Sequence, residues 1–248
     1  MIPNRYDLTA AAQDAHFWFR GFRRFLAPVL DRAAGGRRDL AILDCGCGTG
    51  ANLALLSAYG RLAALDLSPA ALAYARQRGG RLVCGDVTRL PFDDHAFDLV
   101  TSFDVFQSLP DDGTALADIV RVLRPGGRAV VTVSAFEALR GAHSTAWEEQ
   151  RRYTPAMVRR LAAAAGLQSV EVRFLFATLV PPLWVGRRMQ RLLGVEGAPE
   201  GRDRDMEVPA GPINAALGGL LAMEAAASAV VPMPWGSSIL LVGRKSGC

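Results

Sequence analysis

The sequence predicts an α/β fold built on a doubly wound, largely parallel sheet. The first indication is an apolar run at residues 40–43, typical of a buried parallel strand, which ends at Asp44. Three glycines then follow at every second position, Gly46, Gly48 and Gly50. The second indication is that short apolar runs alternate with helical segments along the chain. A length of 248 residues suits one domain of this class.

The glycine turn after the first strand indicates a ligand with a nucleotide-like part. Glycines let the backbone approach such a ligand closely, because no Cβ stands in the way. A dinucleotide fingerprint, Gly-x-Gly-x-x-Gly, opens onto a pyrophosphate, but here the third glycine comes one residue early. Asp44 would repel a pyrophosphate, whereas it suits a cationic ligand with an ammonium group.

Residues 5–34 are expected to form N-terminal helices outside the sheet. They include His-Phe-Trp-Phe-Arg at residues 16–20. Three consecutive aromatic side chains cannot share one helical face, so at least one should look away from the core.

Two further strands are expected at residues 61–67 and 81–85. Asp66 lies about 20 residues beyond the glycines, where an acid typically bonds ribose hydroxyls, and Leu67 is placed to pack on an adenine. Ser68 followed by proline indicates the start of a helix.

The second half of the chain continues the alternation. Strands are expected at residues 96–103, 128–134, 168–176 and 237–244, with helices at 114–123 and from Thr154 to residue 165. Residues 102–109 follow the fourth strand and should line the reaction site, because ligands bind beyond the carboxyl ends of such strands.

About 60 residues separate the last two strands, far more than an ordinary loop, so residues 177–236 are an insert. Its two apolar helical segments need a partner surface. We expect a lid that forms an acceptor pocket. The alternatives are a contact with a twin subunit or with a membrane surface, where Arg187, Arg188 and Arg191 would meet acidic headgroups.

Composition narrows the class of protein. The net charge of +4 comes almost wholly from arginine, since Lys245 is the only lysine, and the arginine clusters are expected to be solvated helix faces. No nucleic-acid partner is therefore expected. Cys45 and Cys47 lack a matching ligand pair, so no metal site is expected either. With no apolar signal core at the N-terminus, a cytoplasmic protein is expected.

Three motifs carry a resemblance to a known family. Asp-Cys-Gly-Cys-Gly-Thr-Gly at residues 44–50 resembles the signature of class I S-adenosylmethionine (SAM)-dependent methyltransferases. Gly-Asp-x-x-x-Leu-Pro-Phe at 85–92 and Leu-Arg-Pro-Gly-Gly at 123–127 are similar to later motifs of the same family, in the same order. The resemblance runs from Leu40 to Arg244. It implies a Rossmann-like sheet of seven strands in the order 3-2-1-4-5-7-6, with the seventh antiparallel, in a single domain over residues 1–248.

The same resemblance implies SAM as methyl donor and S-adenosylhomocysteine as product. Asp66 would bind the ribose, Asp86 would meet the adenine amino group, and Trp18 with Arg20 would close over the cofactor, Arg20 pairing its carboxylate. The full set of expected cofactor-binding residues is Trp18, Arg20, Asp44, Gly46, Cys47, Gly48, Asp66, Leu67, Asp86, Val87, Phe103 and Gln107.

The resemblance indicates the catalytic groups less clearly than the cofactor-binding residues. Many relatives have an acid and a histidine where this chain has Gln107 and Ser108, so a base from these two positions is not expected. The candidates are His143 or Asp104 as base, with Tyr153 orienting the acceptor; His143 is equally well read as a hydrogen-bonded loop histidine. Ser144 and Glu149 replace a further acid and histidine of relatives.

The expected reaction is SN2 transfer of a methyl group to an O, N or C nucleophile of a small, apolar molecule of natural-product, lipid or quinone type. Residues 103–106, Phe-Asp-Val-Phe, differ from the motif of nucleic-acid amine methyltransferases. Two alternatives remain at this point: a NAD(P)-dependent oxidoreductase of the same fold, and a SAM-binding protein without catalysis.

Overall fold

The computed structural model describes residues 5–192 and 206–247, which contain a seven-stranded sheet of order β3-β2-β1-β4-β5-β7-β6. The strands from β1 to β5 run parallel, whereas β7 pairs antiparallel with β5 and β6. This topology confirms the expected fold class. The strands are β1 (Leu40–Cys45), β2 (Gly60–Asp66), β3 (Arg81–Cys84), β4 (Phe97–Phe103), β5 (Leu123–Ser134), β6 (Leu167–Leu175) and β7 (Ser238–Lys245).

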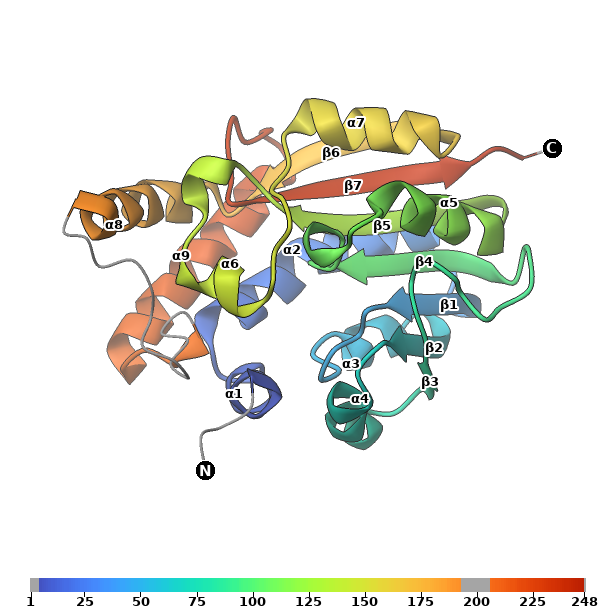
Figure 1. Cartoon of the computed structure of the whole chain (residues 1–248), viewed down its shortest axis with the longest axis horizontal. Coiled ribbons are helices and arrows are strands. Elements are labelled where there is room, and N and C mark those ends of the chain that lie inside the picture. Colours follow the sequence, from blue (N-terminus) through green and yellow to red (C-terminus); the bar gives the residue numbers. More distant parts are fainter. Residues whose placement is uncertain (1–4, 193–205, 248) are drawn as a thin grey trace.

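Helices cover both faces of the sheet (Figure 1). One face carries α2 (Phe17–Ala34), α4 (Pro69–Ala75) and α9 (Gly211–Ser228), and the other carries α5 (Asp112–Val122) and α7 (Pro155–Ala164). Neighbouring strand residues alternate between the two cores, as Ile42 and Leu43 do, so the central strands are buried on both sides. The remaining α-helices of the described residues are α1 (Arg5–Ala12), α3 (Leu53–Ser57), α6 (Ala142–Ala146) and α8 (Val180–Leu192).

The carboxyl ends of the parallel strands meet at one edge, and α1, α6, α8 and α9 gather on that side of the molecule (Figure 1). Asp66 and Phe103 are the last residues of β2 and β4, and Asp44 is the penultimate residue of β1. Since ligands bind at this edge of a doubly wound sheet, the fold brings the expected site residues together.

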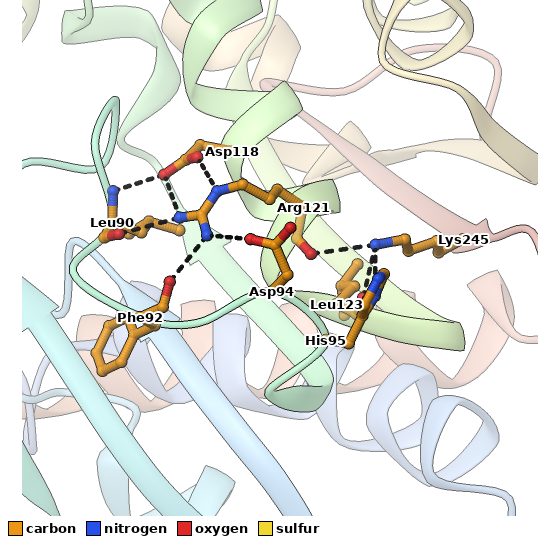
Figure 2. A network of polar contacts seen from close by, with 8 residues as sticks. All are labelled: Leu90, Phe92, Asp94, His95, Asp118, Arg121, Leu123 and Lys245. Carbon is orange, nitrogen blue, oxygen red and sulfur yellow. Dashed lines mark hydrogen bonds and ion pairs between the residues drawn. The ribbon is translucent and has the colours of Figure 1, made fainter.

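Arg121 of α5 fixes the segment between β3 and β4 (Figure 2). Its guanidinium donates to Asp118 at 2.6 Å, to Asp94 at 2.7 Å and to backbone carbonyls of the segment at 2.8 and 3.0 Å. Asp118 also accepts from the Leu90 amide at 2.6 Å, and the hydrogen bond from Arg121 lowers the pKa of Asp94. These contacts steady the loop that carries Asp86.

A buried glutamate ties the insert to the rest of the fold. Glu224 of α9 is 5% exposed, and its carboxylate accepts from the amides of Ala177 at 2.6 Å and Thr178 at 2.9 Å, in the 3-10 turn η4 (Ala177–Leu179). Near the start of α9, the Asn214 side chain accepts from the Phe17 amide at 2.8 Å and thereby caps α2. The helix α9 is therefore an integral part of one face.

One strand is clearly longer than expected, and one helix is short. The fifth strand begins at Leu123 instead of residue 128, because Leu123 already pairs with Phe97 and a bulge precedes the pairing of Arg128 with Leu99. The helix after the glycine turn, α3, spans only five residues because the chain turns at Tyr59 into β2.

Replacing Glu224 with alanine is expected to lower the free energy of unfolding by about 2–4 kcal/mol, since two amides lose their buried acceptor. Urea denaturation followed by tryptophan fluorescence measures this loss. Glu207→Ala removes an exposed glutamate from the same insert and should change stability by less than about 0.5 kcal/mol. Equal unfolding midpoints for the two variants would contradict the anchoring role of Glu224.

Candidate functional site

The glycine turn lies between β1 and α3, and its three glycines have left-handed φ angles of 78°, 54° and 86° at Gly46, Gly48 and Gly50. A Cβ at Gly46 would lie 2.3 Å from the Val105 side chain, so this position is restricted to glycine by both conformation and space. A Cβ at Gly48 would meet nothing within 4 Å. The turn therefore exposes open backbone at Gly48, where a ligand can approach.

Asp44 is almost fully buried, with 3% of its surface exposed. The Thr101 hydroxyl donates to its carboxylate at 2.6 Å. Burial raises the pKa of Asp44 to about 7, the Thr101 hydrogen bond opposes that rise, and the nearby charge of Asp66 adds to it. An ammonium group of a ligand would supply the countercharge that the ionised carboxylate needs in this place.

Asp66 shapes the turn from the neighbouring strand. Its carboxylate accepts from the Gly48 amide at 2.8 Å and from the Ser68 amide at 2.9 Å. Each carboxylate oxygen can accept a second hydrogen bond, so ribose hydroxyls can still bind to this half-buried group. Leu67 follows and is 70% exposed, a large apolar side chain left open beside the strand end.

Asp86 and Val87 lie on the adjacent loop after β3. The Asp86 side chain is exposed and accepts from the Thr88 amide at 2.8 Å, whereas Val87 is 6% exposed. The Gly85 amide donates to the Asp66 carbonyl at 3.1 Å, which joins this loop to the end of β2. Asp86, predicted to meet the adenine, and Val87 thus stand beside the predicted ribose-binding acid.

Cys45 and Cys47 flank Gly46, and both are buried. Burial raises the pKa of each thiol, so both stay protonated at neutral pH and are poor nucleophiles. Within the described ranges no group of three or more His, Cys, Asp or Glu side chains is placed to hold a metal ion.

The end of β4 brings an acid and an amide to the strand edge. Asp104 has a φ of 56°, uncommon for a residue other than glycine, and its carboxylate accepts from the Thr132 hydroxyl at 3.1 Å. Gln107, in the 3-10 turn η2 (Phe106–Ser108), is 4% exposed, and its Oε1 has no hydrogen-bond partner among the described residues. A buried acceptor of this kind is costly, which favours a ligand donor at Gln107.

Four aromatic side chains, here called the aromatic cluster, link α2 to the end of β4: Trp18, Phe22, Phe103 and Phe176. The Trp18 ring stacks on Phe22 at 5.2 Å and on Phe176 at 5.6 Å between centroids. Phe22 in turn meets Phe103 edge-on at 5.5 Å. Trp18 is therefore held by neighbouring rings, at the side of the site that Phe103 borders.

Arg20, expected to close over the cofactor, has an exposed side chain. Arg23, three residues later, donates to the carbonyls of Gln13 at 3.0 Å and Ala51 at 3.3 Å, and the Gln13 side chain accepts from the Thr49 hydroxyl at 2.7 Å. Burial lowers the pKa of Arg23. Sequence reasoning missed Arg23 and Gln13 as supports of the glycine turn; the available signal was that residues three apart share a helix face.

Tyr153 is 1% exposed, and its hydroxyl lies 2.7 Å from the Asp112 carboxylate and 3.1 Å from the Phe106 carbonyl oxygen. Burial raises the pKa of Tyr153, and the hydrogen bond to Asp112 adds to the rise. These contacts join α5 to the turn that carries Gln107. They favour a structural role for Tyr153 over the predicted orientation of an acceptor.

Glu149 and Ser144, where relatives were expected to have other polar groups, form a buried cluster with Arg152. Glu149 accepts from Arg152 Nε at 2.9 Å and from the Ser134 hydroxyl at 3.0 Å, and Arg152 donates to the Ser144 hydroxyl at 3.0 Å. The cluster holds the loop after β5 at the carboxyl edge. The side chain of His143 lies outside the described residues, so its role as a base stays a prediction.

Residues 43–131 match a family model described as a methyltransferase domain. A demethylmenaquinone methyltransferase of Mycobacterium sp. (strain KMS) is 35% identical over 167 residues, which cover 65% of this chain and 69% of that protein. A malonyl-[acyl-carrier protein] O-methyltransferase of Herminiimonas arsenicoxydans is 34% identical over 149 residues, which cover 59% of this chain and 56% of that protein. The two relatives differ in the acceptor that their names state.

A solved structure has the same fold. A SAM-dependent methyltransferase of Thermotoga maritima, described as a possible histamine N-methyltransferase, superposes with a TM-score of 0.61. The alignment covers 98% of this chain and 96% of that chain at 16% sequence identity.

Replacing Asp44 with asparagine is expected to stabilise the ligand-free protein at alkaline pH. The pKa of Asp44 is higher in the folded chain than in the unfolded chain, so ionisation costs stability. That cost grows as the pH rises from about 4 to about 7 and is constant above. The variant should therefore melt above the wild type at pH 8 by a margin that shrinks toward pH 5, as thermal unfolding at both pH values would show.

The same variant should bind SAM at least about tenfold more weakly, because a charge-assisted contact to the ammonium group is lost. Calorimetry at pH 8 measures the affinity. Undiminished SAM affinity, or a wild type that melts above the variant at pH 8, would contradict this role of Asp44.

Asp66→Ala should also weaken the binding of SAM by at least about tenfold, since ribose hydrogen bonds to a charged acceptor contribute about 1.5–3 kcal/mol. Asp93→Ala, an exposed acid in the loop before β4, is the control and should bind SAM normally. Because Asp66 also accepts hydrogen bonds from the amides of Gly48 and Ser68, thermal unfolding of the free variants reports the structural part of the loss. An unchanged affinity in Asp66→Ala would overturn the ribose assignment.

Proposed function

This chain belongs to the class I SAM-dependent methyltransferases, and we propose that it methylates a small, apolar acceptor. In this reaction the nucleophilic atom of the acceptor bonds to the methyl carbon as the carbon–sulfur bond of SAM breaks, and S-adenosylhomocysteine leaves. Membership of a family of enzymes supports methyl transfer over the two alternatives, a NAD(P)-dependent oxidoreductase and a SAM-binding protein without catalysis.

The observation that carries the proposal is the buried carboxylate of Asp44 beside the open backbone of Gly48. SAM has groups that match what the site offers. Its ammonium group would meet Asp44, its ribose would bond Asp66, and its adenine would pack against Leu67 near Asp86. The sulfonium methyl would then point beyond the end of β4.

The acceptor side of the site is proposed around Asp104, Gln107 and the aromatic cluster. Gln107 offers a buried carbonyl oxygen, which would orient a donor group of the cofactor or acceptor. Trp18, the one partly exposed ring of the aromatic cluster, would supply apolar surface for the body of the acceptor, while the other three rings are buried and hold it in place. This combination supports an apolar molecule with one polar group; the relatives' names leave that choice open.

Catalysis is proposed to rest mainly on positioning. Aligning nucleophile, methyl carbon and sulfur in a dry pocket lowers the barrier without covalent help from the protein. If the acceptor loses a proton as it attacks, Asp104 and His143 are the candidate bases. Tyr153 is set aside, because its hydroxyl is already bonded to Asp112.

The insert is proposed to border the acceptor pocket. Part of it is fixed against the body, so it does not act as a mobile flap over its whole length. Leu179 and Leu221 are buried at 8% and 0%, so η4 and α9 are fixed against the body. Trp184 and Met223 are exposed at 49% and 66%, so these two side chains do not line a closed pocket. We therefore propose that only the fixed parts of the insert, η4 and α9, cover the acceptor pocket.

Methyl-labelled SAM and an acceptor panel test the proposed substrate class. The panel pairs an apolar quinol with an acyl thioester and with a small polar amine, each at equal concentration. Label should pass to the quinol, and Asp44→Asn should transfer less label at a SAM concentration that does not saturate the wild type, because it binds SAM more weakly. Transfer confined to the amine or the thioester would contradict an apolar acceptor.

A further inference from the structure

The side of α8 that faces away from the body carries mainly apolar side chains. Leu183 packs against the core, and Arg187 lies over the loop before α6, since a Cβ at Gly141 would be 2.3 Å from its guanidinium. These two residues define the inner side of the helix. The outer side carries four exposed apolar residues, Trp184 (49%), Val185 (53%), Met189 (49%) and Leu192 (70%), here called the outer face.

One arginine, Arg188, lies within the outer face, because it stands four residues after Trp184 and four before Leu192. The sequence of α8, Val180–Leu192, contains three arginines and no acidic residue. The Arg188 guanidinium lies 5.9 Å from the centre of the Trp184 ring, so charge and apolar surface adjoin directly. Helices that expose apolar side chains together with arginine lie in the interface of bilayers, where the arginines meet anionic headgroups.

We propose that α8 docks this protein on an anionic lipid bilayer through its outer face. The helix would lie in the membrane surface, since no helix of residues 5–192 and 206–247 is both long and apolar enough to cross a bilayer. A second copy of the chain fits the outer face of α8 less well than a bilayer does. A two-fold contact centred on α8 would bring two arginine-rich helices together, and like charges would repel.

The position of α8 gives the docking a function. It lies on the side of the molecule toward which the strands of the parallel sheet point (Figure 1), and its inner side contacts the loop that leads into α6. An acceptor dissolved in the bilayer would thus enter from the docked side. The entry of the acceptor from the bilayer rests on the proposed function, whereas the docking of α8 does not.

Flotation with lipid vesicles tests the docking. The full chain should float with vesicles of phosphatidylcholine and phosphatidylglycerol, should not float with phosphatidylcholine alone, and should be released by salt. Substituting Arg188→Gln and Arg191→Gln together should weaken binding by about 30-fold, because each arginine contributes about 1 kcal/mol near an anionic surface. Met189→Asp should abolish it.

The matched control is Arg159→Gln with Arg160→Gln, which removes the same charge from exposed positions on α7 and should keep binding near wild type. Equal loss in both double variants, or equal binding to neutral vesicles, would overturn the proposal. If the chain does not float but has a dimeric mass in solution, and Met189→Asp makes it monomeric, the proposal is overturned and the outer face binds a second copy of the chain. Flotation requires neither SAM nor turnover, so its failure is distinguishable from failure of the proposed methyl transfer.

Discussion

The burial of one carboxylate at the end of β1 is the constraint around which the site is arranged. Asp44 pairs with Ala64 of β2 and Thr101 of β4, so strands enclose it on both sides. In that position an ionised carboxylate loses its hydration, and its pKa rises to about 7. A cationic ligand would reverse this effect, so we propose that the unfavourable burial of Asp44 in the free protein favours binding of the ammonium group of SAM.

The surrounding contacts keep the glycine turn in shape before any ligand binds. Asp66 holds it from β2 through the amide of Gly48, and Arg23 with Gln13 holds it from α2 and the residues before it. Supports of this kind reduce the reorganisation that binding requires. The cofactor side of the site is therefore built on a fixed sheet edge, and we propose that α2, η4 and α9 border the acceptor.

Much of the framework could be predicted because its signals are local. The glycine turn, the acid at the end of β2 and the motif at the start of β5 each depend on a few adjacent residues, and motifs of this kind carried the resemblance that implied the strand order. The contacts of Arg23, Glu224 and Arg152 could not be predicted, because they depend on how distant segments pack. Ser144 and Glu149 illustrate this limit. In the sequence they appear only as replacements of an acid and a histidine of relatives, whereas in the structure they form a buried cluster with Arg152. For α8, the sequence showed apolar residues but not which side stays exposed.

Proton release on SAM binding tests the role of Asp44 most directly. At pH 6 the amino group of free SAM is already protonated, with an α-amino pKa of about 7.7–8.0, whereas Asp44 in the free protein is largely neutral. Binding should then ionise Asp44 and release close to one proton, seen by calorimetry as a binding enthalpy that varies with the ionisation enthalpy of the buffer. Asp44→Asn should release none. A wild-type enthalpy at pH 6 that is the same in all buffers would contradict the account.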